Sequence, residues 1–359
     1  MNAAAPTPGS ARAARGGDRI AVVTTSYPTE PGDPSGHFVA AEVRALRRAG
    51  HSVSVIAPRP EGGQREHGDA RRENVEACGE TDGVRWIEAG GAFGWPGALA
   101  RMREEPRRVI GAVRFVAAAR RELARLGAVD RVVAHFIVPS AFPICAPAWN
   151  AKRALEVVAH GSDVRLLARM PLAVRRRILG MLRGADIRCT STELRDELVR
   201  AGDADFARRV RVAPSPVDVS GTPDREQARR ALGIAADARL FVVVGRLVAG
   251  KRVDVALAAA QLVAGAACVV VGDGPERTAL ERAFPQVRFV GRVPRDVALA
   301  WIAAADVLLS ASRDEGAPSV VREARTLGTR VVAVAAGDLR EWSRFDPGLT
   351  VIPELTALG

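Results

Sequence analysis

A chain of 359 residues, 48% of them hydrophobic, is long enough for two globular domains that each bury a core. It holds no run of about 20 apolar residues, which excludes a fold organised around membrane-spanning helices. The net charge is +11, and +10 of it falls on residues 1–217, so this half is expected to meet something anionic. The four cysteines stand far apart, which excludes a metal or redox motif.

The first half of the chain reads as the opening of a parallel α/β sheet. Residues 1–19, rich in Ala, Gly, Pro and Arg, predict a disordered tail and lack the apolar core of a signal peptide. A strand at Ile20–Thr24, a Pro/Gly-rich loop, a helix that ends at Gly50 and a strand at Val53–Ala57 follow. Later strands are predicted at Val132–His135, Leu155–Ala159 and Ile187–Thr190.

The pattern starts afresh after a polar stretch that follows residue 214. One helix is predicted at Val253–Val263, and strands at Leu240–Val244, Cys268–Val271, Val287–Val290, Val307–Leu309 and Val331–Val334. Two doubly wound, Rossmann-like domains, 20–217 and 218–359, fit this order. Ligands of such sheets bind outside the carboxyl ends of the strands, so the expected site is an interdomain cleft.

Two cations follow a buried strand at Gly245–Lys251. Arg246 offers a bidentate fork, Lys251 a point charge, and the following helix offers free N–H groups. A diphosphate needs such groups, although a solvated basic loop is the alternative interpretation. The segment is not a Walker loop, because the Ser/Thr after the lysine is missing.

Two carboxylates flank a Gly/Pro-bent loop at residues 314–324. Ser319 is the predicted N-cap of a helix, which leaves Glu315 in the loop before it and Glu323 one turn into it. The carboxylates could face sugar and ribose hydroxyls, while the N–H groups of Ser319 and Val320 meet phosphate. An acidic first turn that complements the helix dipole is the alternative.

Glycine and histidine mark further loops. His160 follows a strand and precedes Gly161, a position where histidine can meet a ligand, whereas Ser162 or Asp163 could cap the next helix. Gly36 could let the backbone approach a phosphate closely. For His37 and His135 we expect structural roles. The Gly272–Asp273–Gly274 run lacks the NAD fingerprint, and no Asp-x-Asp pair is present to hold Mg²⁺, so we expect a metal-independent reaction without a cofactor.

The segment 164–188 carries seven arginines among apolar residues. Such a stretch is typical of an anionic membrane surface, and a solvated helix face is the alternative. The chain is therefore expected to be cytoplasmic and peripheral at the inner face of the cell membrane. The arginine excess is attributed to genome composition, and no nucleic-acid partner is expected.

Together these features resemble the retaining glycosyltransferases of family 4, which have the GT-B fold. The likeness covers nearly all the chain from Ile20 and rests on the order of its motifs. These are SGHF (35–38), LRRAGHSVSVIAP (46–58), HGSD (160–163), GRLVAGK (245–251), VGDGPER (271–277), FVGRV (289–293) and AADVLLSASRDEGAPSVVREA (304–324).

The resemblance implies transfer of a sugar from a nucleotide sugar to a glycan or lipid-linked acceptor, with retention at the anomeric carbon. Arg246 and Lys251 would bind the diphosphate, Glu315 the sugar and Glu323 the ribose. His160 would lie beside the reacting centre, with Asp163 on the acceptor side. Gly36 and Gly272 would approach the donor, and the base would lie near Arg292 and Val293.

The sequence departs from the family pattern at several positions. Arg252, Pro216 and Ser319 stand where Gly, Gly and Asn are usual, and Ala336–Gly337 replaces a Gly pair. The chain reaches Gly359 without the family's terminal crossover helices, so the second domain is expected to lack them. A GT-B nucleotide-sugar epimerase and an inactive sugar-nucleotide-binding scaffold are the alternative functions.

Overall fold

The computed structural model describes residues 17–30, 32–33, 35–59, 83–94, 98–146, 154–202, 204–313 and 315–353. Most of the predicted tail, Cys78, Asp314 and the last six residues lie outside these ranges. The tail prediction is wrong at its end, because Arg19 already pairs with Ser52 in the first sheet. No helix in the described ranges is both long and apolar enough to cross a bilayer.

The first sheet is wholly parallel and, within the described residues, has seven strands in the order β3-β2-β1-β4-β5-β6-β7. Its strands are β1 (Arg19–Val23), β2 (Ser52–Arg59), β3 (Val84–Glu88), β4 (Arg131–His135), β5 (Ala154–Ala159), β6 (Asp186–Cys189) and β7 (Val210–Val212). Its helices are α1 (His37–Arg48), α2 (Ala98–Glu104), α3 (Arg108–Arg125), α4 (Ser162–Ala168), α5 (Leu172–Met181), α6 (Thr192–Val199) and α7 (Ala204–Arg208), with a wider helical segment η1 (Ile137–Cys145) after β4.

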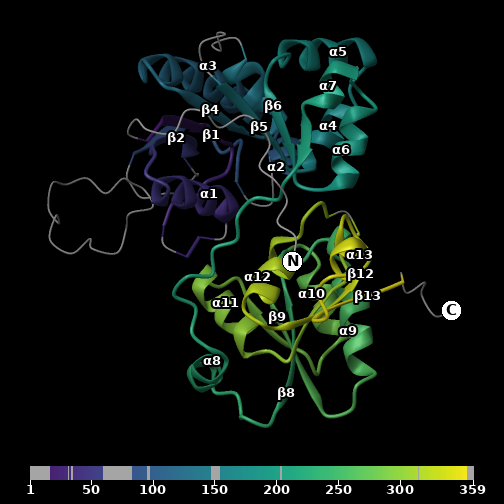
Figure 1. Cartoon of the computed structure of the whole chain (residues 1–359). Helices are drawn as coiled ribbons and strands as arrows, with labels where there is room; N and C mark the ends of the chain where they lie inside the picture. Colours follow the sequence, from purple (N-terminus) through teal and green to yellow (C-terminus); the bar gives the residue numbers. More distant parts are fainter. Residues whose placement is uncertain are drawn as a thin grey trace, which may run out of the picture.

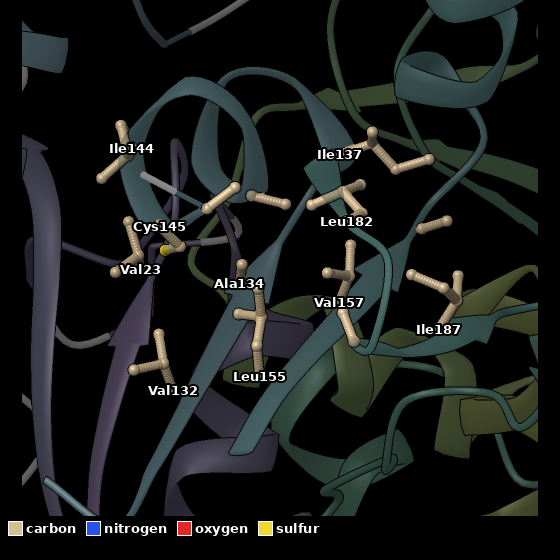
Figure 2. Close-up of a cluster of buried hydrophobic side chains, with 14 of the residues drawn as sticks. Val23, Val132, Ala134, Ile137, Ile144, Cys145, Leu155, Val157, Leu182 and Ile187 are labelled. Carbon is tan, nitrogen blue, oxygen red and sulfur yellow. The ribbon is translucent and has the colours of Figure 1, made fainter. Parts of the chain in front are cut away.

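Strand alternation divides the first core into two layers. On β4, Val132 and Ala134 join the cluster shown in Figure 2, whereas Val133 points to the opposite face and packs with α1. A strand sends successive side chains to opposite faces, so a continuous β-branched run buries both. The layer in Figure 2 also includes Ile137 and Cys145 of η1, so this segment closes over the sheet next to the carboxyl end of β4.

The second sheet has the order β10-β9-β8-β11-β12-β13 among the described residues. Its strands are β8 (Arg239–Val244), β9 (Ala266–Val271), β10 (Arg288–Gly291), β11 (Val307–Ser310), β12 (Arg330–Val334) and β13 (Leu349–Ile352). Its helices are α8 (Arg225–Leu232), α9 (Val253–Gln261), α10 (Arg277–Ala283), α11 (Arg295–Ala304), α12 (Ser319–Thr326) and α13 (Leu339–Trp342), with a single turn η2 (Ala249–Lys251) before α9.

The loops at the carboxyl ends of the two sheets face each other. The Arg295 N–H, after β10, donates to the Gly32 carbonyl, after β1, at 2.6 Å. The Thr192 N–H, after β6, donates to the Asp338 carboxylate, after β12, at 2.9 Å. Figure 1 shows the resulting two-unit arrangement, in which α1 lies on the side of the first unit nearest α11 and α12. The expected doubly wound fold with a cleft between two Rossmann-like units is confirmed.

The arginine-rich stretch 164–188 is not one continuous amphipathic helix. It contains most of α4, all of α5 and the start of β6. Arg188 is a buried strand residue, 5% exposed, and therefore does not belong to any surface. Within the stretch, α5 exposes large apolar side chains, because Leu172 and Val174 are 47% and 44% exposed.

Candidate active site between the two sheets

The predicted cations lie on the loop that follows β8. Arg246 is exposed and belongs to the loop, and Lys251 lies in η2 just before α9. Lys251 Nζ forms an ion pair with the Glu315 carboxylate from the loop after β11. A backbone hydrogen bond from Arg313 to Gly250 ties the same two loops together (3.1 Å). The fold therefore brings Lys251 and Glu315 into contact, although 64 residues separate them in the chain.

Close backbone approach between neighbouring loops explains the glycines of the second unit. Gly272 has φ +142°, and a Cβ there would overlap the Gly245 carbonyl. The Gly272 N–H donates to the Gly291 carbonyl at 2.9 Å. Gly337 similarly packs against the backbone of Glu315 and Gly316, leaving no room for a side chain. Larger residues at these positions would displace the loops that carry the candidate ligand-binding groups.

Glu323 lies on α12 at the boundary between the two units and is 7% exposed. Arg295 Nη2 donates to Glu323 Oε1 at 2.7 Å, and His37 Nε2, on α1, lies 3.4 Å from the same oxygen. Burial opposes the charge of Glu323, but the contact with His37 and the guanidinium of Arg295 outweigh it, so its pKa is lowered. His37, for which we expected a structural role, thus reaches across the cleft.

The prediction that Ser319 caps α12 is wrong. Pro318 occupies the cap position, and Ser319 is the first residue of the helix, without a side-chain capping bond. Ser319 and Val320 are both half-buried in the first turn. Their backbone N–H groups are among those that a helix start leaves without an intrahelical partner. The first-turn N–H groups lie where the sequence predicted them, their contact with phosphate stays a prediction, and the Ser319 side chain does not serve as the cap.

Arg292 and Val293 form the loop between β10 and α11. Arg292 Nη2 donates to Asp33 Oδ1 of the first unit at 3.4 Å. Val293 packs against the core of the second unit. On the facing loop, a Cβ on Gly32 would crowd Pro294 Cβ at 2.8 Å. The loop predicted to lie near the base is thus in contact with the first unit.

Gly36 begins α1 with φ +65°. A Cβ there would overlap the backbone of Ser26 and Tyr27, so local packing already requires glycine. The next residue, His37, contacts Glu323, which brings Gly36 to the cleft as expected.

His160 directly follows β5 and is held by its neighbours. Its Nε2 lies 3.0 Å from Nδ1 of His135, at the end of the adjacent strand β4. The rings of Phe38 and Phe136 lie 4.6 and 4.8 Å from the His160 ring, centroid to centroid. Burial, and secondarily the charge of Arg188, lowers the pKa of His160 to about 3, so the imidazole is neutral at neutral pH.

Asp163, expected on the acceptor side, lies beneath the His160 loop and is 2% exposed. Its Oδ1 accepts from the N–H groups of His160 and Gly161, both at 3.0 Å, and its Oδ2 accepts from the Ile137 N–H at 2.7 Å. It is not the N-cap of α4, which is Gly161. The carboxylate therefore orients the histidine loop through backbone contacts.

Sequence reasoning missed the polar groups behind His160, namely His135 and Glu42. His135 is fully buried at the carboxyl end of β4, and its Nε2 lies 3.9 Å from Oε2 of Glu42, on α1. The sequence held a signal for His135. The predicted strands that end at His135 and Ala159 would bring His135 and His160 to one sheet edge if the two strands were neighbours.

A cavity of about 520 Å³ lies between α1 and α11, beside Glu323. It is lined by His37, Arg44, Arg48, Arg295 and Leu299 among others. Asp218, the first residue of the predicted second domain, accepts from Arg44 Nε at 2.7 Å and Arg48 Nη2 at 2.8 Å. The cavity therefore adjoins the segment that joins the two units and not the Lys251–Glu315 pair.

Known proteins resemble this chain over both units. The family model for glycosyltransferase family 4 matches residues 35–220, and the model for glycosyl transferases group 1 matches residues 238–357. The teichuronic acid biosynthesis glycosyltransferase TuaC of Bacillus subtilis is 27% identical over 330 residues, or 89% of this chain and 81% of the relative. A D-inositol 3-phosphate glycosyltransferase of Thermomonospora curvata is 36% identical over 134 residues, 32% of this chain and 31% of that protein.

Solved structures share the fold at low sequence identity. Sucrose-phosphate synthase from Thermosynechococcus elongatus superposes with a TM-score of 0.68 at 19% identity, covering 95% of this chain and 87% of that one. HepE of Anabaena, in complex with UDP, gives a TM-score of 0.62 at 17% identity, with 94% and 86% covered. Both likenesses support the two-unit architecture.

Proposed function

Because the chain belongs to glycosyltransferase family 4, we propose that it transfers a sugar from a nucleotide-sugar donor to an acceptor with retention and without a metal. The observation that carries this proposal is the ion pair of Lys251 with Glu315, which joins the loops after β8 and β11 at the edge of the second sheet that faces the first unit. Arg246 lies on the first of these loops, and His160 lies at the carboxyl end of β5 in the first unit. Three opposed groups are thereby available: cations for phosphate, a carboxylate for sugar hydroxyls and a neutral histidine.

The donor diphosphate is assigned to Arg246, Lys251 and the first-turn N–H groups of Ser319 and Val320. A sugar diphosphate leaving group gains negative charge as the anomeric C–O bond breaks, and fixed cations stabilise that charge. Lys251 is paired with Glu315. Donor binding would redirect the ammonium towards phosphate and free the carboxylate for sugar hydroxyls.

The nucleoside is assigned to Glu323 and the loop of Arg292 and Val293. Glu323 is ionised at neutral pH because its pKa is lowered, so it can accept from ribose hydroxyls. It would exchange the His37 contact for the ribose while Arg295 keeps it oriented. Gly36 and Gly272 allow the surrounding loops to approach one another closely.

The transfer itself would proceed on one face of the sugar. The anomeric C–O bond to phosphate breaks, the bond to the acceptor oxygen forms, and the acceptor proton passes to the departing phosphate oxygen. No protein base is required for this balance. His160, neutral and fixed between aromatic rings, would hydrogen-bond a sugar hydroxyl near the reacting carbon, and Asp163 would position it through the backbone.

A donor panel tests this function. We expect release of the nucleoside diphosphate from one of a set of UDP-, GDP- and ADP-linked sugars, measured with a coupled assay at micromolar protein. Adding EDTA should leave the rate unchanged, and the anomeric configuration of the product, read by NMR, should match that of the donor. Tight nucleotide binding without turnover of any donor would instead favour the inactive scaffold, and isomerised nucleotide sugar would favour the epimerase.

We assign the acceptor to the cell envelope. The support is the relative of this chain that is named for teichuronic acid biosynthesis. We further assign α5 to an anionic membrane surface at the inner face of the cell membrane. On this helix Leu172 and Val174 are exposed beside the exposed Arg176 and Arg177. Interfacial helices bury apolar side chains at the headgroup boundary and carry cations beside them, as α5 does with its adjacent arginines.

Vesicle binding checks this assignment. Replacing Arg175, Arg176 and Arg177 by Gln is expected to weaken binding to phosphatidylglycerol-containing vesicles by roughly 100-fold, at about 1 kcal/mol for each of the three cations. A matched variant replaces Arg230, Arg239 and Arg282, exposed on the second unit, and changes the net charge equally. Equal weakening in both variants would show a non-specific charge effect and sink the α5 assignment.

A further inference from the structure

Behind His160 lies a row of buried polar side chains. The proposed donor contacts do not use them. His135 is fully buried, and Glu42 and Arg188 are 7% and 5% exposed. His135 connects to His160 at 3.0 Å through Nδ1 and faces Glu42 Oε2 at 3.9 Å through Nε2. Glu42 Oε1 is bonded to Arg188. Side chains from α1, β4 and β6 therefore meet behind His160, the residue that follows β5.

The protons of the two imidazoles are coupled. Burial lowers the pKa of both rings, so each carries one proton at neutral pH. One proton must lie between His135 Nδ1 and His160 Nε2, because two bare nitrogens at 3.0 Å would repel. If His160 donates it, the other proton is on His135 Nε2. If His135 donates it, the other proton is on His160 Nδ1.

Which of these two proton placements is favoured depends on the group that faces His135 Nε2. That group is Glu42 Oε2, 3.9 Å away, and neither atom has a hydrogen-bond partner among the described residues. Burial and the neighbouring Glu156 carboxylate raise the pKa of Glu42, whereas the permanently charged guanidinium of Arg188 opposes the rise.

The wider cluster also favours an ionised Glu42. Arg188 Nε donates to Glu156 at 2.9 Å, and Glu156 also meets Arg211 at 2.8 Å and Arg131 at 3.6 Å. Three guanidinium groups therefore surround two carboxylates. Neutralising Glu42 would remove one of the two carboxylates that compensate the buried Arg188, which is costly.

We propose that Glu42, acting through His135, holds His160 with its proton on Nε2 and its Nδ1 as a hydrogen-bond acceptor. The negative charge of an ionised Glu42 favours an N–H over a lone pair on the facing His135 Nε2, 3.9 Å away. A proton on that nitrogen makes His135 Nδ1 an acceptor and His160 Nε2 the donor. His160 Nδ1 has no hydrogen bond within the described residues and remains for a ligand hydroxyl. Glu42 and His135 are thus positioning residues, and only the identity of that hydroxyl rests on the proposed function.

The variant Glu42→Gln should reverse the chain. Arg188 donates to Oε1, so the glutamine places its carbonyl there and its NH₂ group towards His135 Nε2. That nitrogen must then accept, which moves the proton of His135 to Nδ1 and the proton of His160 to Nδ1. A change of one atom in the carboxylate would therefore convert His160 from an acceptor to a donor towards its ligand.

Ring-¹⁵N NMR of the full chain, with histidine labelled, measures this without any substrate. The chain has five histidines, which single substitutions assign. In the wild type both His135 and His160 should show Nε2–H tautomers, and in Glu42→Gln both should show Nδ1–H tautomers. A wild-type His160 with its proton on Nδ1 overturns the proposal even if the variant fails to fold. Glu156→Gln, which touches Arg188 but not His135, should leave both tautomers unchanged.

Kinetics supply a second readout. Glu42→Gln should lower kcat by about 100-fold, with the KM for the donor changed by less than about 3-fold, because a wrong tautomer removes an oriented contact without removing the ligand site. In a His160→Ala background the same substitution should have little further effect, since both act through one ring. Additive losses contradict the relay. Absence of turnover with every donor would defeat the proposed function and leave the tautomer result standing.

Discussion

Replacing Lys251 by alanine is expected to lower kcat for sugar transfer by about 100-fold to 1000-fold, the cost of removing one preorganised group from a developing charge. Lys251 is one of two lysines in the chain and pairs with Glu315. Its loss removes a cation and also leaves an uncompensated carboxylate close to the diphosphate. Steady-state kinetics with the donor found in the panel measure the effect.

The variant Lys251→Arg is the matched control. It keeps the charge but changes a compact ammonium into a planar fork, so we expect recovery of part of the lost kcat. Lys251→Ala with unchanged kcat and a raised donor Kd would mean that this residue contributes only uniform binding. A doubly neutral variant, Lys251→Ala with Glu315→Gln, should lose less than the two single losses combined, because the residues are in contact.

Replacing His160 by alanine is expected to lower kcat by roughly 100-fold to 1000-fold, the cost of one preorganised contact at the reacting centre, while donor affinity changes little. The side chain is held by Phe38, Phe136 and His135 on the unit opposite the donor loops, where it would meet the reacting sugar. Its loss leaves the diphosphate and nucleoside contacts in place. The kcat of the variant and its donor Kd, from calorimetry, separate these contributions.

Glu323→Ala should show the opposite pattern, with donor affinity weakened by roughly 10-fold to 100-fold, as for a lost hydrogen bond to a charged group. Glu323 also connects the units through His37, so the variant must be checked for thermal stability before its Kd is interpreted. Equal loss of affinity in the His160 and Glu323 variants would refute the division of roles between them.

Strands in the middle of both sheets were predictable from residue type, whereas three edge strands were not. β4, β5 and β8 are β-branched runs buried on both faces, which makes their signal strong. β3, β7 and β13 lie at sheet edges and interrupt their apolar residues with Arg, Glu or Thr. A strand with one neighbour needs less apolar surface and leaves a weaker pattern.

Residue order along the chain placed the candidate site at the correct edges of the two sheets. Gly245, Gly272 and the Gly/Pro loop before α12 follow buried strands, and parallel strands carry their ligand loops at the carboxyl ends. That inference needs only local sequence, because a glycine or cation next to a strand end keeps that position in any parallel arrangement. The ligand roles of these residues remain predictions.

Contacts between distant segments depended on strand order and on how the two units face each other. His135 meets His160 because β4 and β5 are neighbours, and Glu42 joins them because α1 covers that edge. Glu323 meets His37 only because the loops of one sheet face those of the other. Local composition carries no information on such pairings, so a buried histidine and a helix glutamate looked structural in sequence, while packing made them the support of His160.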